Sequence, residues 1–376
     1  MNEPLLTCDV GSLPFSGDLE SFLKGADLYN SLLELLHPKD PSISEPCRHF
    51  EEKIVEGLLG KLGAGVDIPN FPQFRDMNEM FLQPIEGVRK TKSGYEFTDR
   101  LKLSSERKAL PELEAIRRNA SRIRNAVGHR IALKICITGP YTLSSLFVNR
   151  TADMFGEFSG VLQQIVEAGV VAQKNVEIAL VAVDEPSFGI MSDPLLDRGM
   201  PGREMLLKAW EEICYKAKIG GAKTLIHLHS TVDDLFWSAK NLDLVESHVD
   251  NHLYESTRAK QLCEKFDKSL KASIAITNFD SLIRRQITAS TPNLNETSIG
   301  QSVADTWTLI KKGKVDPITY LETQEEVESR LRRIVELFGE ERVPFAGPEC
   351  GMSSFPNLNC ALEYLRRISG AAKRKP

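Results

Sequence analysis

The chain lacks the features that would place it in a membrane or on a nucleic acid. No segment approaches the roughly 20 consecutive apolar residues that a membrane-spanning helix requires. The opening stretch, MNEPLLTCDVGSLPF, does not combine basic residues with a following apolar run, as a secretory signal does. A formal net charge of −5 excludes a globally basic nucleic-acid-binding protein. We therefore expect a cytoplasmic protein that binds neither a membrane nor a nucleic acid.

Paired cysteines and linkers are also missing. The seven cysteines are an odd number and lie far apart, unlike the closely spaced even set of a disulfide-stapled domain. We expect free thiols in a reducing compartment. No Gly/Ser/Pro-rich linker, low-complexity run or repeat of solenoid period divides the chain, which favours a single domain over residues 1–376.

Eight short apolar runs alternate with longer segments of helical period, and this pattern is typical of a parallel α/β fold. In chain order the runs are LLTCDVGS, GVDIPNF, IALKICITGP, IALVAVDEP, KTLIHLHS, HLYEST, ASIAITNFD and VPFAGPECG. Eight strand–helix units in one undivided chain predict an α/β fold of the (β/α)₈ TIM-barrel type. The segment around 288–320 is longer than a barrel connection needs, and it predicts an insertion.

Nearly every apolar run ends in polar or reactive side chains. These ends are Gly11 and Ser12, Gly139 to Thr142, Asp184 and Glu185, His227 and His229, Glu255, Asn278 and Asp280, and Glu349 and Cys350. Active sites of TIM barrels lie at the carboxyl ends of the strands, so these residues would converge on one rim. An open doubly wound sheet gathers strand ends only around its switch point, and it would not explain so many polar ends.

The stretch TLIHLHSTVDD carries two histidines that point to the same face of a strand, because they are two residues apart. A single histidine at a strand end is more often a satisfied core residue than a ligand. Here Glu255 and Cys350 would reach the same rim. Two imidazoles, a carboxylate and a thiolate form a set that zinc prefers. The sequence therefore predicts a Zn²⁺ site of His227, His229, Glu255 and Cys350.

The order of several motifs resembles the catalytic barrel of the cobalamin-independent methionine synthase family, in the short form without the duplicated N-terminal barrel. The motifs are DVGSLPF, RDMNEMF, ITGPYTLSSLF, VDEPSFG, IHLHST, YESTR and GPECGM. The resemblance covers nearly the whole sequence, and the wider superfamily includes corrinoid-dependent thiol methyltransferases and uroporphyrinogen decarboxylase. It implies a methyltransferase in which zinc activates the thiol of homocysteine, giving methionine.

Family members hold zinc with His, Cys, Glu and Cys, and the resemblance places these ligands on His227, His229, Glu255 and Cys350. The chain departs from the pattern because there is no cysteine from Leu228 to Val232. Either His229 replaces that cysteine, or the alignment shifts by two residues and puts Thr231 there. We prefer the first alignment, because threonine is a poor zinc ligand.

The family binds the amino-acid part of its acceptor near the positions that match Gly11, Ser12, Asp184 and Glu185 here. The segment IPNFPQFRDM lacks the Gly-Glu that the family also uses. The ammonium group would then be held differently, or the acceptor is another thiol, similar to coenzyme M.

The family also has a proton-donating histidine, and the matching segment ITNFDS places Asp280 at that position. A carboxylic acid donates a proton only if burial raises its pKa. Capping of the helix that begins SLIRRQ is an equally good interpretation of Asp280.

The methyl donor is open between a methylated corrinoid, carried by a partner protein, and a methyl-tetrahydropterin. No Asp-x-His-x-x-Gly cobalamin motif occurs in the chain, so a corrinoid would arrive with its carrier.

Two other functions are alternatives to the methyltransferase. A decarboxylase similar to uroporphyrinogen decarboxylase would need arginines near the first strand, and GSLPFSGDLESF has none. A non-catalytic barrel is favoured by the missing cysteine and Gly-Glu.

Overall fold

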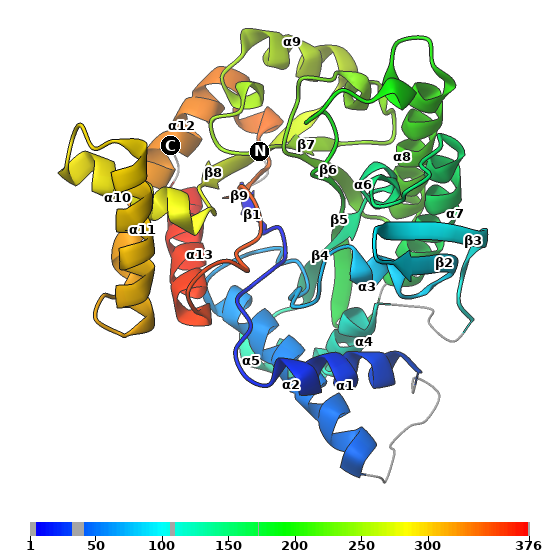
Figure 1. Ribbon diagram of the computed structural model, residues 1–376, viewed down its shortest axis with the longest axis horizontal. Helices are drawn as coiled ribbons and strands as arrows, with labels where there is room; N and C mark the ends of the chain where they lie inside the picture. Colours follow the sequence, from blue (N-terminus) through cyan, green and yellow to red (C-terminus); the bar gives the residue numbers. More distant parts are fainter. Residues whose placement is uncertain (1–4, 32–40, 106–109, 172, 375–376) are drawn as a thin grey trace.

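Seven parallel strands form one sheet that curls into a ring in the computed structural model, which describes residues 5–31, 41–105, 110–171 and 173–374 (Figure 1). Every pair of neighbours in the ring is parallel. Across the sheet the order is β1 (Leu6–Thr7), β9 (Phe345–Pro348), β8 (Ser269–Ala275), β7 (Leu244–Glu246), β6 (Lys223–Leu228), β5 (Val176–Glu185) and β4 (Ile131–Thr138).

The segment 68–73 fills the gap between the two edges of this sheet. Ile68 forms an isolated parallel bridge with Cys8, just after β1, and Asn70 forms another with Lys134 of β4. The segment therefore takes the eighth strand position, as its apolar run predicts. The α/β fold of the (β/α)₈ type is confirmed.

Helices cover the outside of the ring (Figure 1). They are α1 (Leu19–Ser31), α2 (Pro41–Gly63), α3 (Glu79–Leu82), α4 (Pro111–Arg118), α5 (Ala120–Val127), α6 (Pro140–Ser145), α7 (Asp153–Gly169), α8 (Pro201–Ile219), α9 (Thr257–Phe266), α10 (Phe279–Ser290), α11 (Glu296–Lys311), α12 (Gln324–Phe338) and α13 (Leu358–Lys373). None of the helices in the described part of the chain is both long and apolar enough to cross a membrane.

The barrel strands are buried on both faces, because helices cover one face and the ring encloses the other. On β4, Ile135 and Ile137 join the core between strands and helices, while Cys136 between them joins a smaller cluster with Leu180 and Leu225. Successive side chains of a strand point to opposite faces, so this smaller cluster fills the inside of the barrel.

Two connections contain elements beyond the helices that cover the ring. An antiparallel hairpin of β2 (Ile85–Thr91) and β3 (Gly94–Leu103) precedes α4. Between β8 and β9, the predicted insertion at 288–320 contains the end of α10, all of α11 and the short 3-10 helix η4 (Pro317–Tyr320). Helices α10 and α11 pack together at the left of the ring in Figure 1.

The prediction of a strand at HLYEST is wrong. Residues His252–Tyr254 form a 3-10 helix, η3, and the strand in this part of the chain is β7, which ends at Glu246. The side chain of Asn251 accepts the backbone N–H two residues further on, and this local bond favours a turn over a strand. The end of this strand therefore presents Glu246 and His248 to the rim, and Glu255 lies beyond a further turn.

A buried ion pair fixes the chain that follows β1. Lys61 of α2 and Asp9 are both almost fully buried, and their charged atoms, Nζ and Oδ2, are 2.6 Å apart. The same Nζ donates to the carbonyl oxygens of Gly11 and Asn70, and the Asn70 N–H donates to Asp9 Oδ1. One lysine thus joins α2, the chain after β1 and the segment that closes the ring.

We expect Lys61→Met to lower the free energy of unfolding by about 3–5 kcal/mol, because it leaves the Asp9 carboxylate buried without its partner. Urea unfolding would show a lower midpoint with an unchanged slope. The double variant Asp9→Asn/Lys61→Met should regain part of this loss. Strict additivity of the two single losses would contradict the account.

Candidate metal centre

Four side chains meet at the carboxyl ends of three barrel strands. His227 and His229 come from the end of β6, His248 lies two residues beyond β7, and Cys350 lies two residues beyond β9. One ligand atom of each residue lies within 4.8 Å of those of the other three. Ligands bound to a tetrahedral zinc at about 2.0–2.3 Å are about 3.3–3.8 Å from one another. A small inward movement would therefore bring all four onto one metal ion.

Three of the four predicted ligands belong to this group, and the fourth does not. The structure brings His227, His229 and Cys350 together. Glu255 is exposed at the end of η3 and lies outside the group, so the structure does not bring it together with the other three. The fourth member of the group is His248, which the sequence motifs did not indicate.

One signal in the sequence could have identified His248. The stretch LVESH repeats the arrangement of TLIHLH, in which an apolar run is followed by two polar side chains at alternate positions. In a strand, Glu246 and His248 would point to the same face, as His227 and His229 do. Strand β7 has only three residues, and so short a run gives a weak signal in the sequence.

Two of the nitrogen atoms that would bind a metal have no hydrogen-bond partner among the described residues. His227 Nε2 and His248 Nε2 are buried and, within the described part of the chain, form no hydrogen bond. Cys350 Sγ lies 3.9 Å from His229 Nε2. Buried polar atoms are nearly always paired, so these two unpaired nitrogens need an explanation. A bound metal ion explains both, and the four residues fit zinc.

A carboxylate behind the ligands orients the first histidine. Glu246 Oε1 is 2.7 Å from His227 Nδ1, and its other oxygen is 2.8 Å from Lys271 Nζ. Asp184, His227 and Glu246 are register partners on β5, β6 and β7, so their side chains lie side by side inside the barrel. A histidine whose Nδ1–H is donated to a carboxylate presents Nε2 to a metal, and such partners recur behind zinc ligands.

The charges around the group shift the pKa values of its members in the metal-free protein. Burial acts against the imidazolium of His227, but the Glu246 and Asp184 carboxylates outweigh it and raise the pKa to about 10. Burial also acts against the thiolate of Cys350, but the neighbouring imidazoles of His227 and His229 outweigh it and lower the pKa to about 7. Near neutral pH, His227 is therefore protonated, and a metal must displace its proton.

Two predicted substrate-binding residues lie beside the ligands. Asp184 Oδ1 is buried without a hydrogen-bond partner in the described chain, and it is 3.9 Å from His227 Nε2. The Ser12 hydroxyl accepts the N–H of Ser353, and it lies so close to Gly351 that a Cβ there would be 2.0 Å from Ser12 Oγ. Ser12 is thereby held next to the residue that follows Cys350.

The other two predicted substrate-binding residues, Gly11 and Glu185, contact only other parts of the protein. Gly11 has a φ of +150°, and a Cβ there would lie 2.1 Å from Gln73 Oε1, so only glycine fits. Glu185 is fully buried and accepts two backbone N–H groups at the start of α6 and the indole N–H of Trp210. Both of its oxygens are occupied by the protein itself. Burial outweighs these bonds and raises the pKa of Glu185 to about 7.

Asp280 lies in the first turn of α10 and is exposed. Its Oδ1 accepts the indole N–H of Trp307 at 2.6 Å, and the helix is capped by Asn278, which accepts from Ser281 N. Among the contacts of the described residues, none joins Asp280 to the four candidate ligands. Its role in proton transfer stays a prediction.

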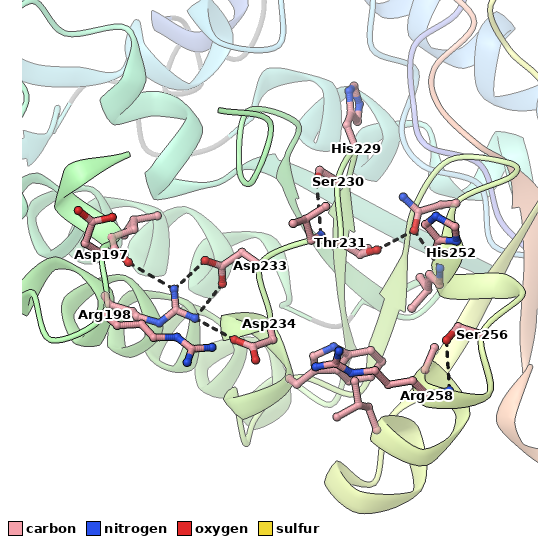
Figure 2. A pocket seen from close by; sticks show the side chains of 18 residues that line it. Asp197, Arg198, His229, Ser230, Thr231, Asp233, Asp234, His252, Ser256 and Arg258 are labelled. Atoms are coloured by element: carbon pink, nitrogen blue, oxygen red, sulfur yellow. Dashed lines mark hydrogen bonds and ion pairs between the residues drawn. The ribbon is translucent and has the colours of Figure 1, made fainter. Parts of the chain in front are cut away.

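A cavity of about 600 Å³ opens beside His229, and Figure 2 shows the side chains that line it. The Thr231 hydroxyl donates to Asn251 Oδ1 at 2.7 Å. Arg203 holds the carboxylate of Asp233 with two bonds of 2.7 and 2.9 Å. Because Thr231 has this partner and His227 belongs to the group of four, the geometry favours the alignment that pairs His229 with His227 over the one that pairs it with Thr231.

No protein-family model matches the sequence, and no curated protein matches it. Among solved structures, a B12-independent methionine synthase from Shewanella sp. W3-18-1 in complex with selenomethionine matches with a TM-score of 0.58 and 15% identity, over 98% of this chain and 97% of that chain. GH5_18 from Streptomyces cattleya in complex with GlcNAc matches with a TM-score of 0.49 and 12% identity, over 100% of this chain and 82% of that chain. The first match supports a distant TIM-barrel relationship. At this identity it shows similarity of fold only.

We expect His248→Ala to lose zinc and Glu255→Gln to keep it. Loss of a partner behind a ligand already costs about 10–100-fold in affinity, so loss of a ligand should cost at least as much. The measurement is zinc per chain after dialysis, followed by competition with a chromophoric chelator. The opposite pattern would restore Glu255 to the ligand set.

Zinc affinity should also rise with pH. Zinc binds the neutral imidazole of His227, whose pKa is raised to about 10, so binding above the Cys350 pKa of about 7 displaces one proton. The apparent affinity should then rise about tenfold per pH unit between about pH 7.5 and 9. Glu246→Gln removes the main attraction for that proton and should flatten the slope. A flat profile in the unmodified protein would show that His227 carries no proton to displace.

Proposed function

We propose that this protein is a zinc-dependent methyltransferase that methylates the sulfur of a small thiol, with homocysteine as acceptor and methionine as product. The observation that carries the proposal is the group of His227, His229, His248 and Cys350 at the carboxyl ends of the barrel strands. Zinc held there would lower the pKa of a bound thiol and supply a thiolate nucleophile at neutral pH. The distant similarity to a methionine synthase supports the same class of reaction.

The charge of the ligand set favours an anionic sulfur. Three neutral imidazoles and one thiolate leave a zinc centre with a net charge of +1, and one further thiolate would bring it to neutrality. The predicted set, with Glu255 in place of His248, would have been neutral before substrate bound. The histidine therefore strengthens the attraction for a thiolate.

The side chains around the ligands suit an amino-acid thiol. Asp184 Oδ1, 3.9 Å from His227 Nε2, is a buried acceptor without a partner in the described chain, and it could hold an ammonium group. The Ser12 hydroxyl, next to the Cys350 loop, could donate to a carboxylate. These residues would replace the missing Gly-Glu of the resembled family. Another small thiol, similar to coenzyme M, is the alternative acceptor.

We infer that the donor is a methylated corrinoid on a carrier protein or a methyl-tetrahydropterin, used in the cytoplasm, where thiols stay reduced. The cavity beside His229 gives such a donor an approach to the rim. Zinc-free alternatives, a decarboxylase or a non-catalytic barrel, would leave the two unpaired histidine nitrogens without a purpose.

The test is an assay of zinc-loaded protein with methylcobalamin or a methyl-tetrahydropterin glutamate, and with homocysteine or coenzyme M. We expect zinc-dependent formation of the methylated thiol, measured by mass spectrometry, and loss of the methyl–cobalt absorbance when methylcobalamin is the donor. Cys350→Ser should abolish turnover, because a hydroxyl is a weak neutral ligand, while Glu255→Gln should retain it. The absence of transfer with every pair of donor and acceptor would sink the proposal.

A further inference from the structure

One buried carboxylate outside the ligand group joins the ends of three barrel strands. Glu349 follows β9 directly, and the residue is only 7% exposed. Its Oε2 accepts the N–H of Val249 at 2.9 Å, and its Oε1 accepts the N–H of Thr277 at 2.9 Å. Its own N–H donates to the carbonyl of Ala275 at 3.0 Å. Glu349 therefore ties the chain after β7, the chain after β8 and the end of β9 together.

This bridge connects two of the candidate ligands. Val249 is the neighbour of His248, and Glu349 is the neighbour of Cys350. Both ligands lie beyond the last residue of their strands, where no ladder of strand hydrogen bonds sets the position of the backbone. The Glu349 carboxylate supplies a fixed link at that point.

A lysine makes the corresponding link for the first histidine. Lys271 of β8 pairs with Glu246, which holds His227, and the same Nζ donates to the carbonyl oxygen of Pro348 at the end of β9. Both buried links thus end on the short piece of chain that carries Cys350. One starts from the side of His227, and the other starts from the side of His248.

We propose that Glu349 is a positioning residue of the metal centre, which holds the backbone at His248 in a fixed place relative to Cys350 before the metal binds. This inference rests on the proposed zinc centre and adds a residue that is not a ligand. A carboxylate suits the role because both groups that it meets are N–H donors. A glutamine of the same shape would turn its own NH₂ toward one of these donors and keep only one bond. Ligands held in this way lose less freedom on binding, so the metal binds more tightly.

The chain offers a matched control at the opposite end of the barrel. Asp243 precedes β7, and its Oδ2 accepts the N–H of Thr224 at 2.9 Å and the Thr224 hydroxyl at 3.0 Å. It therefore ties the amino-terminal ends of two neighbouring strands, as Glu349 ties carboxyl-terminal ends. Asp243→Asn should affect stability without a direct effect on the ligands.

The experiment compares Glu349→Gln with Asp243→Asn by zinc affinity, by the visible absorption spectrum of the Co²⁺-loaded protein and by urea unfolding of the metal-free protein. We expect Glu349→Gln to weaken zinc binding about 10–100-fold and to alter the Co²⁺ spectrum. Asp243→Asn should keep both the affinity and the spectrum of the unmodified protein. Should Glu349→Gln fail to fold, Glu349→Asp, which keeps the charge but shortens the reach, carries the same expectation.

Unchanged zinc affinity in Glu349→Gln would overturn this inference alone, and so would equal weakening in both variants. If the unmodified protein binds neither zinc nor Co²⁺, the proposed zinc centre fails and the inference fails with it. A lack of methyl transfer in a protein that binds zinc would bear only on the proposed function.

Discussion

The hydrogen bond between Glu246 and His227 is the interaction on which the rest of the site depends. Both side chains are fully buried, and an isolated charge there would be costly. Burial acts against ionisation of Glu246, but Lys134, Lys271 and His227 hold its pKa well below the ordinary range. The carboxylate therefore stays charged and accepts a hydrogen bond from the Nδ1–H of His227. This bond turns Nε2 of the ring toward the other ligands. Without this arrangement, the imidazole could turn or change tautomer.

The parallel register of the barrel explains why these groups meet. Asp184, His227 and Glu246 occupy one row across three neighbouring strands, and His229 and His248 stand two residues further along theirs. Alternate residues share a face, so the second row lies directly above the first and nearer the rim. Below both rows the inside of the barrel is filled mainly with apolar side chains. The inside of the barrel thus has three layers. An apolar layer lies at the bottom, a layer of charged side chains that orients His227 lies above it, and a layer of further candidate ligands lies at the rim.

Much of this could be predicted from the sequence. Eight apolar runs ending in polar residues predicted the ring and the gathering of polar side chains at one rim, because burial on both faces leaves a clear signal in a parallel strand. The prediction was wrong at the sixth run, because the strand is the three-residue β7 and HLYEST forms a 3-10 turn, so the group at the rim contains His248 and not Glu255. The partners of Glu185 could not be predicted either, because the Trp210 indole reaches it only through packing of α8 against β5. Such contacts between distant residues leave no local pattern.

The central claim is that three histidine nitrogens and one cysteine sulfur bind a zinc ion that accepts the substrate thiol. Zinc K-edge X-ray absorption of the loaded protein tests it most directly. The account predicts nitrogen ligands at about 2.0–2.1 Å and one sulfur at about 2.3 Å. Saturating homocysteine should add a second sulfur at a similar distance. A zinc shell without sulfur, or a single sulfur that does not change when homocysteine is added, would contradict the account.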